Sequence, residues 1–139
     1  MNEHQIFQSL NIALISNAIY TCGVFFLIWV SFRAARSARD ENASVIAKVL
    51  VSLFGLGVVF NGLLLGGFLR LNMASAAGQL QAMKAAGEKL SGTAEVFLTI
   101  PMVTQADPKF SMVPDPIMVV WWTVVVLLIL GITWLPVKK

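Results

Sequence analysis

Charged residues are scarce in this chain. Its 139 residues include 10 basic and 7 acidic side chains, 12% of the total, against 58% hydrophobic residues and a mean hydropathy of +0.80. Soluble domains carry about 25% charged residues. The ranges 5–32, 49–69 and 117–137 contain no Asp, Glu, Lys or Arg, and each is long enough to cross a bilayer. The sequence therefore excludes a water-soluble globule and predicts an integral membrane protein.

Cysteine and histidine are almost absent. With only Cys22 and His4, one chain cannot form a disulfide, a His/Cys zinc site or a bis-histidine haem site. The acidic pair Asp40 and Glu41 comes with no nucleophile, and no phosphate-binding loop is present. We therefore expect no catalytic activity, no metal and no cofactor, although a bound phospholipid is compatible with the sequence. The few basic residues are divided between both membrane faces, which argues against nucleic acid as a partner. No small-molecule substrate is identified.

Three transmembrane helices are predicted, over residues 10–32, 49–69 and 117–135. At 1.5 Å per residue, 21 residues cover roughly 31 Å, close to the roughly 30 Å hydrocarbon core. Lipid offers the backbone no hydrogen-bond partners, so helix is expected even where Val and Ile are frequent. A cleavable signal peptide begins with basic residues, which the first span lacks. The first span is also longer than the apolar region of a signal peptide. We expect an all-α integral membrane protein with a single membrane domain, residues 1–139, and an outer loop over 71–116.

Basic residues determine the predicted orientation. The loop after the first span carries Arg33, Arg36, Arg39 and Lys48, and the chain ends in two lysines, whereas the N-terminal segment has neither Lys nor Arg. By the positive-inside rule the N-terminus is periplasmic and the C-terminus cytoplasmic. The Ala-, Gly- and Val-rich composition favours a bacterial inner membrane. The three arginines are expected to contact lipid headgroups, each gaining about 1 kcal/mol, and so to anchor the topology; a specific lipid or partner site is the alternative.

Small residues mark one face of the second span. They fall at alternating spacings of three and four, and Gly62 and Gly66 form a small-xxx-small pair, which lets helix backbones approach closely in lipid. We expect this face to pack on a helix of the same or another chain; a ligand passage is the alternative. The predicted packing face comprises Ser52, Gly55, Val59, Gly62 and Gly66.

Polar side chains within the spans lie at similar predicted depths. Asn17 and Asn61 are seven and eight residues from the outer ends of their spans, which places both about 10–12 Å below the outer boundary. Thr123 of the third span falls at a similar level. We predict that the three residues form one intramembrane polar layer, either as packing hydrogen bonds or as the lining of a passage.

The loops are expected to contain further elements. Asn42 or Ser44 is a predicted N-cap for the second span. Residues 74–90 predict an amphipathic helix that continues the second span or lies on the surface, with Gly78 as the point of any bend and Gly92 as its stop. The run 95–104 contains Pro101, which favours a short extended segment. The apolar side chains of this run are expected to face a partner or the headgroup region: Val96, Phe97, Leu98, Ile100, Met102 and Val103.

Together these features favour a non-catalytic accessory subunit of a larger inner-membrane complex. Such a subunit would pack on other integral membrane subunits and on membrane lipids, and would cap a partner with its outer loop. The alternative is a homo-oligomeric pore or transport component. In its three spans, outer N-terminus and basic tail the chain resembles phage-type holins, a likeness of topology that implies a self-assembled pore, although the long outer loop departs from that family. The spans carry no charged residue of the kind used in ion or proton pathways, which favours the accessory role.

Overall fold

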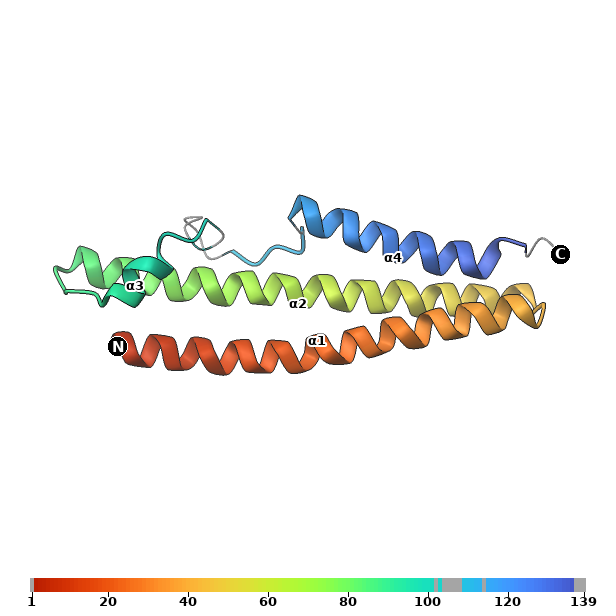
Figure 1. Cartoon of the computed structure of the whole chain (residues 1–139), viewed down its shortest axis with the longest axis horizontal. Helices are drawn as coiled ribbons and strands as arrows, with labels where there is room; N and C mark the ends of the chain where they lie inside the picture. The colour runs from red at the N-terminus through yellow and green to blue at the C-terminus, as the bar shows by residue number, and fades with distance from the viewer. Residues whose placement is uncertain (1, 102, 104–108, 114, 137–139) are drawn as a thin grey trace. The chain divides into compact units, whose positions relative to one another are not determined.

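The chain is helical wherever the structure assigns it regular secondary structure. The computed structural model describes residues 2–101, 103, 109–113 and 115–136. Four helices follow one another, α1 (Glu3–Asp40), α2 (Val45–Ala85), α3 (Gly92–Phe97) and α4 (Pro116–Trp134) (Figure 1). The helices α1, α2 and α4 are long and apolar enough to cross a membrane. This confirms the predicted all-α class with three candidate spans.

The turn between α1 and α2 uses two different caps. Asn42 has a left-handed backbone with φ of 48°, and the N–H groups of Asn42 and Ala43 donate to the carbonyls of Arg39 and Ala38. This bond pattern is the Schellman motif that ends many helices, so Asn42 terminates α1 rather than starting α2. Ser44 is the N-cap of α2, because its hydroxyl accepts from the N–H of Ala47 at 3.3 Å.

The helix α2 is longer than the predicted second span and ends earlier than the predicted amphipathic helix. It continues without interruption through Gly78 to Ala85, which is the outward continuation considered above. Gly87 has φ of +84°, and the N–H groups of Gly87 and Glu88 donate to the carbonyls of Lys84 and Met83. A second Schellman motif therefore ends this helix, and the predicted stop at Gly92 is wrong.

The segment expected to be extended begins as a helix. Residues 92–97 form α3, with Ser91 as its N-cap accepting from the N–H of Ala94 at 3.3 Å. No strand lies among the described residues for this segment to pair with. A helical turn satisfies its own backbone groups, whereas a single unpaired strand does not. The prediction of an extended run from residue 95 is therefore wrong for residues 95–97.

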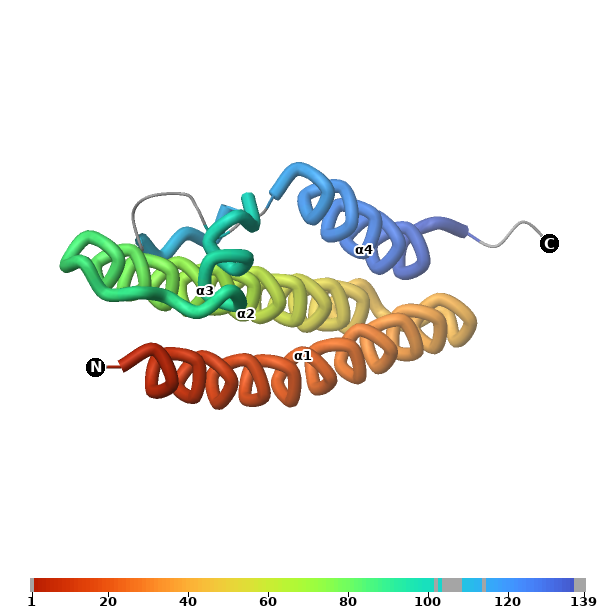
Figure 2. Tube along the Cα trace, turned by 60° about the vertical axis from the view of Figure 1, so that its left-hand side comes forward, coloured from red at the N-terminus to blue at the C-terminus, as the bar shows by residue number. Residues whose placement is uncertain are grey.

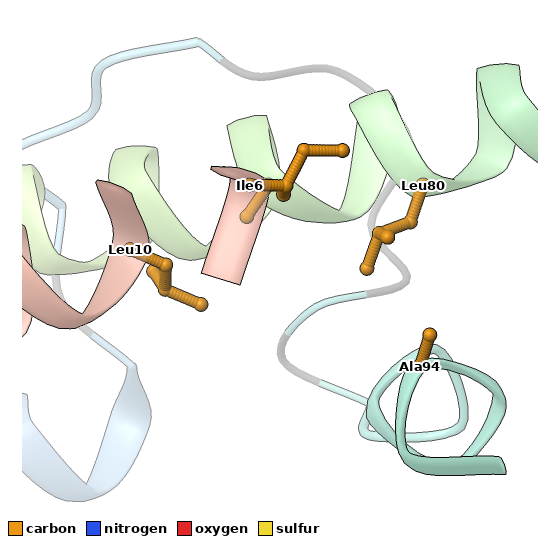
Figure 3. Close-up of a cluster of buried hydrophobic side chains, with 5 residues drawn as sticks. Ile6, Leu10, Leu80 and Ala94 are labelled. Carbon is orange, nitrogen blue, oxygen red and sulfur yellow. The ribbon is translucent and has the colours of Figure 1, made fainter. Parts of the chain in front are cut away.

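The chain divides into two compact units, each built from parts of the long helices. One unit comprises residues 1–19 and 65–112, and the other comprises residues 20–64 and 113–139. The first unit has an apolar core between the start of α1, the end of α2 and the short helix α3 (Figure 3). Its buried members are Ile6, Leu10, Ala76, Leu80 and Ala94.

In the second unit, the C-terminal half of α1 and the N-terminal half of α2 lie side by side in both views (Figures 1 and 2), and α4 packs on α2. The apolar surface in this unit is mostly outward-facing. Within each whole candidate span helix, the share of an apolar 18-residue segment that is buried is 11% in α1, 28% in α2 and 17% in α4. Such exposure is unfavourable in water and expected in lipid.

Candidate functional site

The small-residue face of α2 is the docking surface for α4. A β-carbon built on Gly55 would lie 2.7 Å from Cγ2 of Ile129, and one built on Gly62 would overlap the ring of Trp122. Val59, between these two glycines, is buried. The two glycines therefore allow the bulky side chains of α4 to reach the α2 backbone.

A hydrogen bond closes the other end of the same interface. The indole nitrogen of Trp134 donates to the hydroxyl of Ser52 at 3.0 Å, and that hydroxyl donates to the carbonyl of Lys48 at 2.9 Å. Gly66, the remaining member of the predicted face, has open space where its β-carbon would lie. Three of the five predicted residues, Ser52, Gly55 and Gly62, thus contact α4, whereas Val59 is buried and Gly66 has open space beside it.

The three residues of the predicted polar layer bond to main-chain carbonyls. The Asn17 amide donates to the carbonyl of Leu65 at 2.9 Å, which ties α1 to α2 in the first unit. Asn61 and Thr123 lie in the second unit and donate to carbonyls of their own helices, at Gly57 and Val119. Only the Asn17 bond joins two helices among these three, so a common layer stays a prediction.

Asn61 is nevertheless exposed on the second span. One N–H of its amide is used by the carbonyl of Gly57 at 2.9 Å. A carboxamide offers two N–H donors and two acceptor lone pairs. The bond to Gly57 therefore uses only one part of the hydrogen-bonding capacity of this side chain. A β-carbon on Gly57 would meet no atom within 4 Å. Gly57 and Asn61 therefore form an open patch, small and polar, near the middle of the predicted second span.

Basic and aromatic side chains meet on α1 of the second unit. The guanidinium of Arg33 lies over the ring of Trp29, 5.5 Å from its centroid. Arg36 is exposed, whereas the Nε of Arg39 pairs with the carboxylate of Asp40 at 3.2 Å. The three predicted headgroup residues are therefore not equivalent, because the charge of Arg39 is already compensated.

The apolar run after residue 95 is divided between the core and the surface. Phe97 and Leu98 pack against the core of the first unit, where Phe97 makes an edge-to-face contact with Phe7 at 5.7 Å. Val103 is also buried. Val96 and Ile100 are exposed, and Met102 lies outside the described residues. Among the described residues of this run, Val96 and Ile100 are the ones left exposed for a partner or the headgroup region.

The contact between the carboxylate of Glu3 and the hydroxyl of Ser91 is not among the contacts predicted from the sequence. The hydroxyl and the N–H of Ser91 both donate to the carboxylate of Glu3, the N–H at 2.9 Å. The hydroxyl bond first, and then the N–H bond, lower the pKa of Glu3 below its ordinary value. The available signal was Ser91 itself, a preferred N-cap residue directly before a short helix. The prediction of Gly92 as the end of a helix is incompatible with Ser91 as the N-cap of a new one.

The loop that leads towards α4 is fastened to α2. The guanidinium of Arg70 donates to the carbonyl of Ser111 at 2.8 Å, and the rings of Phe68 and Phe110 lie 5.0 Å apart. A β-carbon on Gly67 would lie 2.8 Å from that same carbonyl oxygen. This contact holds the loop close to the predicted outer end of the second span.

The first unit also contains a small cavity. The cavity has a volume of about 110 Å³ and lies between α1 and α2, with uncharged polar side chains from Ser9, Asn72, Ser75 and Gln79 in its wall. Among the described residues no group of three His, Cys, Asp or Glu side chains is placed to hold a metal. The interface of α2 with α4 is a packing arrangement.

Comparison with known proteins adds no relative. No protein-family model, no curated protein and no solved structure matches this chain.

Proposed function

We propose that this protein is a non-catalytic accessory subunit of a larger membrane complex, most simply in a bacterial inner membrane. The observation that carries the proposal is the exposed amide of Asn61 within the second span, beside the open surface of Gly57. An amide facing hydrocarbon leaves hydrogen-bonding capacity unused, and polar residues in spans usually face another helix. The patch therefore supports contact with a neighbouring transmembrane helix.

The occupation of the other small face strengthens this argument. Gly55 and Gly62 are covered by α4 of the same chain, so they are not available to another subunit. The Gly57 and Asn61 patch, in contrast, is a small and polar surface of α2 with open space beside Gly57. In the first unit, exposed Val96 and Ile100 offer a second, extramembrane contact for the same partner.

The experiment is purification from the native membrane in mild detergent, followed by a native gel and mass spectrometry of all co-migrating chains. We expect a foreign membrane protein in fixed stoichiometry. The double variant Gly57→Leu/Asn61→Leu should release it, because the leucines fill the open surface and remove the amide. Thr123→Val is the matched control, since it removes an exposed polar group of α4 and leaves the Gly57 and Asn61 patch of α2 intact.

A homo-oligomeric pore is the second candidate, and the same Asn61 amide supports it. A ladder of this chain alone, abolished by the double variant, would overturn the accessory role and favour the pore. Conductance measurements on reconstituted protein would then test whether Asn61→Leu changes the current.

A further inference from the structure

The exposed face of α1 in the second unit changes its chemistry along the helix. At 100° per residue, Cys22, Phe26, Trp29, Arg33 and Arg36 fall within roughly 80° of arc. All five are exposed. From Cys22 to Arg36 the exposed side chains change from apolar to aromatic to basic. We call these five residues the aromatic–basic strip.

This strip lies opposite the face of α1 that the chain buries. The buried positions of the same segment recur on the far side of the helix. They are Val24, Ile28, Ser31, Ala35 and Ala38. Because the packing within the chain uses that far side, the strip faces the surroundings of the protein.

Contacts within the strip orient its side chains. The rings of Phe26 and Trp29 lie 5.7 Å apart, and the guanidinium of Arg33 lies 5.5 Å from the centroid of the Trp29 ring. A guanidinium held over an aromatic face keeps its outward N–H groups available for an anion. Arg36 follows three residues later, nearly one helical turn, and adds a second charge on the same face.

The depth of the strip matches the layers of a lipid leaflet. The predicted first span ends at Phe32, so Phe26 and Trp29 fall inside it and the two arginines fall just outside. Trp29 and Arg36 are separated by roughly 10 Å along the helix axis, and each headgroup layer is roughly 5–7 Å thick. Tryptophan favours that boundary, and arginine favours the phosphate beyond it.

We infer that the aromatic–basic strip is a binding site for an anionic phospholipid, whose phosphate lies between Arg33 and Arg36 and whose glycerol and upper acyl chains lie against Trp29 and Phe26. Asp40 lies one turn beyond Arg36, and its carboxylate is paired with Arg39 at 3.2 Å. The acidic side chain therefore limits the site to Arg33 and Arg36. The inference does not depend on the accessory role and stands or falls separately from it.

The first test is native mass spectrometry of the full chain in detergent with equal amounts of phosphatidylglycerol and phosphatidylcholine of matched acyl chains. We expect the protein to retain phosphatidylglycerol preferentially. Each of Arg33→Gln and Arg36→Gln should lower that retention about fivefold, the equivalent of about 1 kcal/mol per basic residue near an anionic surface. Phosphatidylcholine retention should not change.

Arg39→Gln is the matched control, because it removes the same charge from the same helix but from a residue already paired with Asp40. Equal helical circular dichroism of all variants would show that they fold. A loss of retention in Arg39→Gln as large as in Arg33→Gln would overturn the site, since the effect would then be unspecific charge. Wild-type retention in the Arg33→Gln/Arg36→Gln double variant would also overturn it.

The second test locates the lipid. Phosphatidylglycerol brominated near the glycerol end of its acyl chains should quench a part of the tryptophan fluorescence that is missing in Trp29→Phe, and phosphatidylcholine with the same label should quench it less. Equal quenching by the two lipids would contradict the inference. Displacement of phosphatidylglycerol by millimolar inorganic phosphate would likewise overturn it, by showing a site for soluble anions.

Discussion

At the scale of the residue, the glycines of α2 decide how closely α4 approaches. The space beside Gly62 is filled by the ring of Trp122, whereas a β-carbon on Gly57 would have nothing within 4 Å. The two positions are five residues apart on α2, and both are glycine. They differ only in whether a neighbouring helix covers them.

Gly62→Ala should therefore destabilise the second unit. Overpacking of this kind costs about 1–3 kcal/mol, because either the Trp122 ring or the whole of α4 must move. Gly57→Ala is the matched control and should be neutral or slightly stabilising, since alanine favours helix. Thermal unfolding in detergent measures both variants. Equal melting temperatures would contradict the close packing of α2 and α4.

The Glu3 carboxylate makes the first unit sensitive to acid. Its pKa is lowered in the folded protein by the bonds from the Ser91 hydroxyl and N–H, so the folded state binds this proton less well than the unfolded state. The contact therefore stabilises the fold above the ordinary pKa of a glutamate, and this stabilisation is lost as the pH falls through the lowered folded value.

Hydrogen exchange checks this expectation. The N–H of Ser91 should exchange faster on acidification than the intrinsic pH dependence of exchange predicts, and in Glu3→Gln this extra acceleration should be absent. Glu88→Gln is the control, since it changes an exposed carboxylate of the same unit. An identical pH response of wild-type protein and Glu3→Gln would rule out the contact as its source.

At the scale of the element, helix ends depend on single residues with unusual backbone angles. Gly87 ends α2 with φ of +84°, a conformation that costs an alanine about 1 kcal/mol or more. Gly78 lies inside the same helix, and a β-carbon there would meet nothing. The same substitution should therefore have opposite effects at the two positions.

We expect Gly87→Ala to destabilise the first unit by about 1 kcal/mol and Gly78→Ala to stabilise it by about 0.5–1 kcal/mol. Chemical denaturation followed by helical circular dichroism measures the difference between the two variants. A stabilising Gly87→Ala would mean that α2 does not end in the left-handed turn seen here.

The helix α3 shows where local pattern fails. Pro101 and the apolar residues before it favour an extended segment, but Ser91 provides an N-cap and Ala94 packs into the core of the first unit. Burial of Ala94, Phe97 and Leu98 requires them on one side of the chain, which helical spacing provides and an alternating strand does not. Contacts with α1 and α2, distant in sequence, decide this conformation.

At the scale of the whole molecule, α1 and α2 exceed the thickness of a bilayer. With 38 and 41 residues they extend roughly 57 and 61 Å, about twice the hydrocarbon core. The core of Ile6, Leu10 and Leu80 involves helix ends beyond, or at the edge of, the predicted spans. These residues belong to the first unit, which also includes residues 10–19 and 65–69 of the predicted spans.

The orientation of the chain in the membrane can be tested by labelling one cysteine in each of the two units. In a Cys22→Ser background, Lys89→Cys should react with a membrane-impermeant maleimide added to intact cells, and Glu41→Cys should react only after the cells are opened. The expectation follows from the arginines that follow the first span. Labelling of Glu41→Cys alone in intact cells would reverse the proposed orientation.

The sequence by itself determined the class of the protein. Long ranges without charge allow only helices in lipid, because the backbone has no other hydrogen-bond partner there, and the three candidate spans followed from that constraint. The small residues of α2 also marked a packing face before its partner was known. Only the tertiary structure decided that α4 covers Gly55 and Gly62, that Ser91 holds Glu3, and that Phe97 and Leu98 turn inward. Each of these contacts joins segments far apart in the chain, and hydropathy and local spacing carry no information about such pairs.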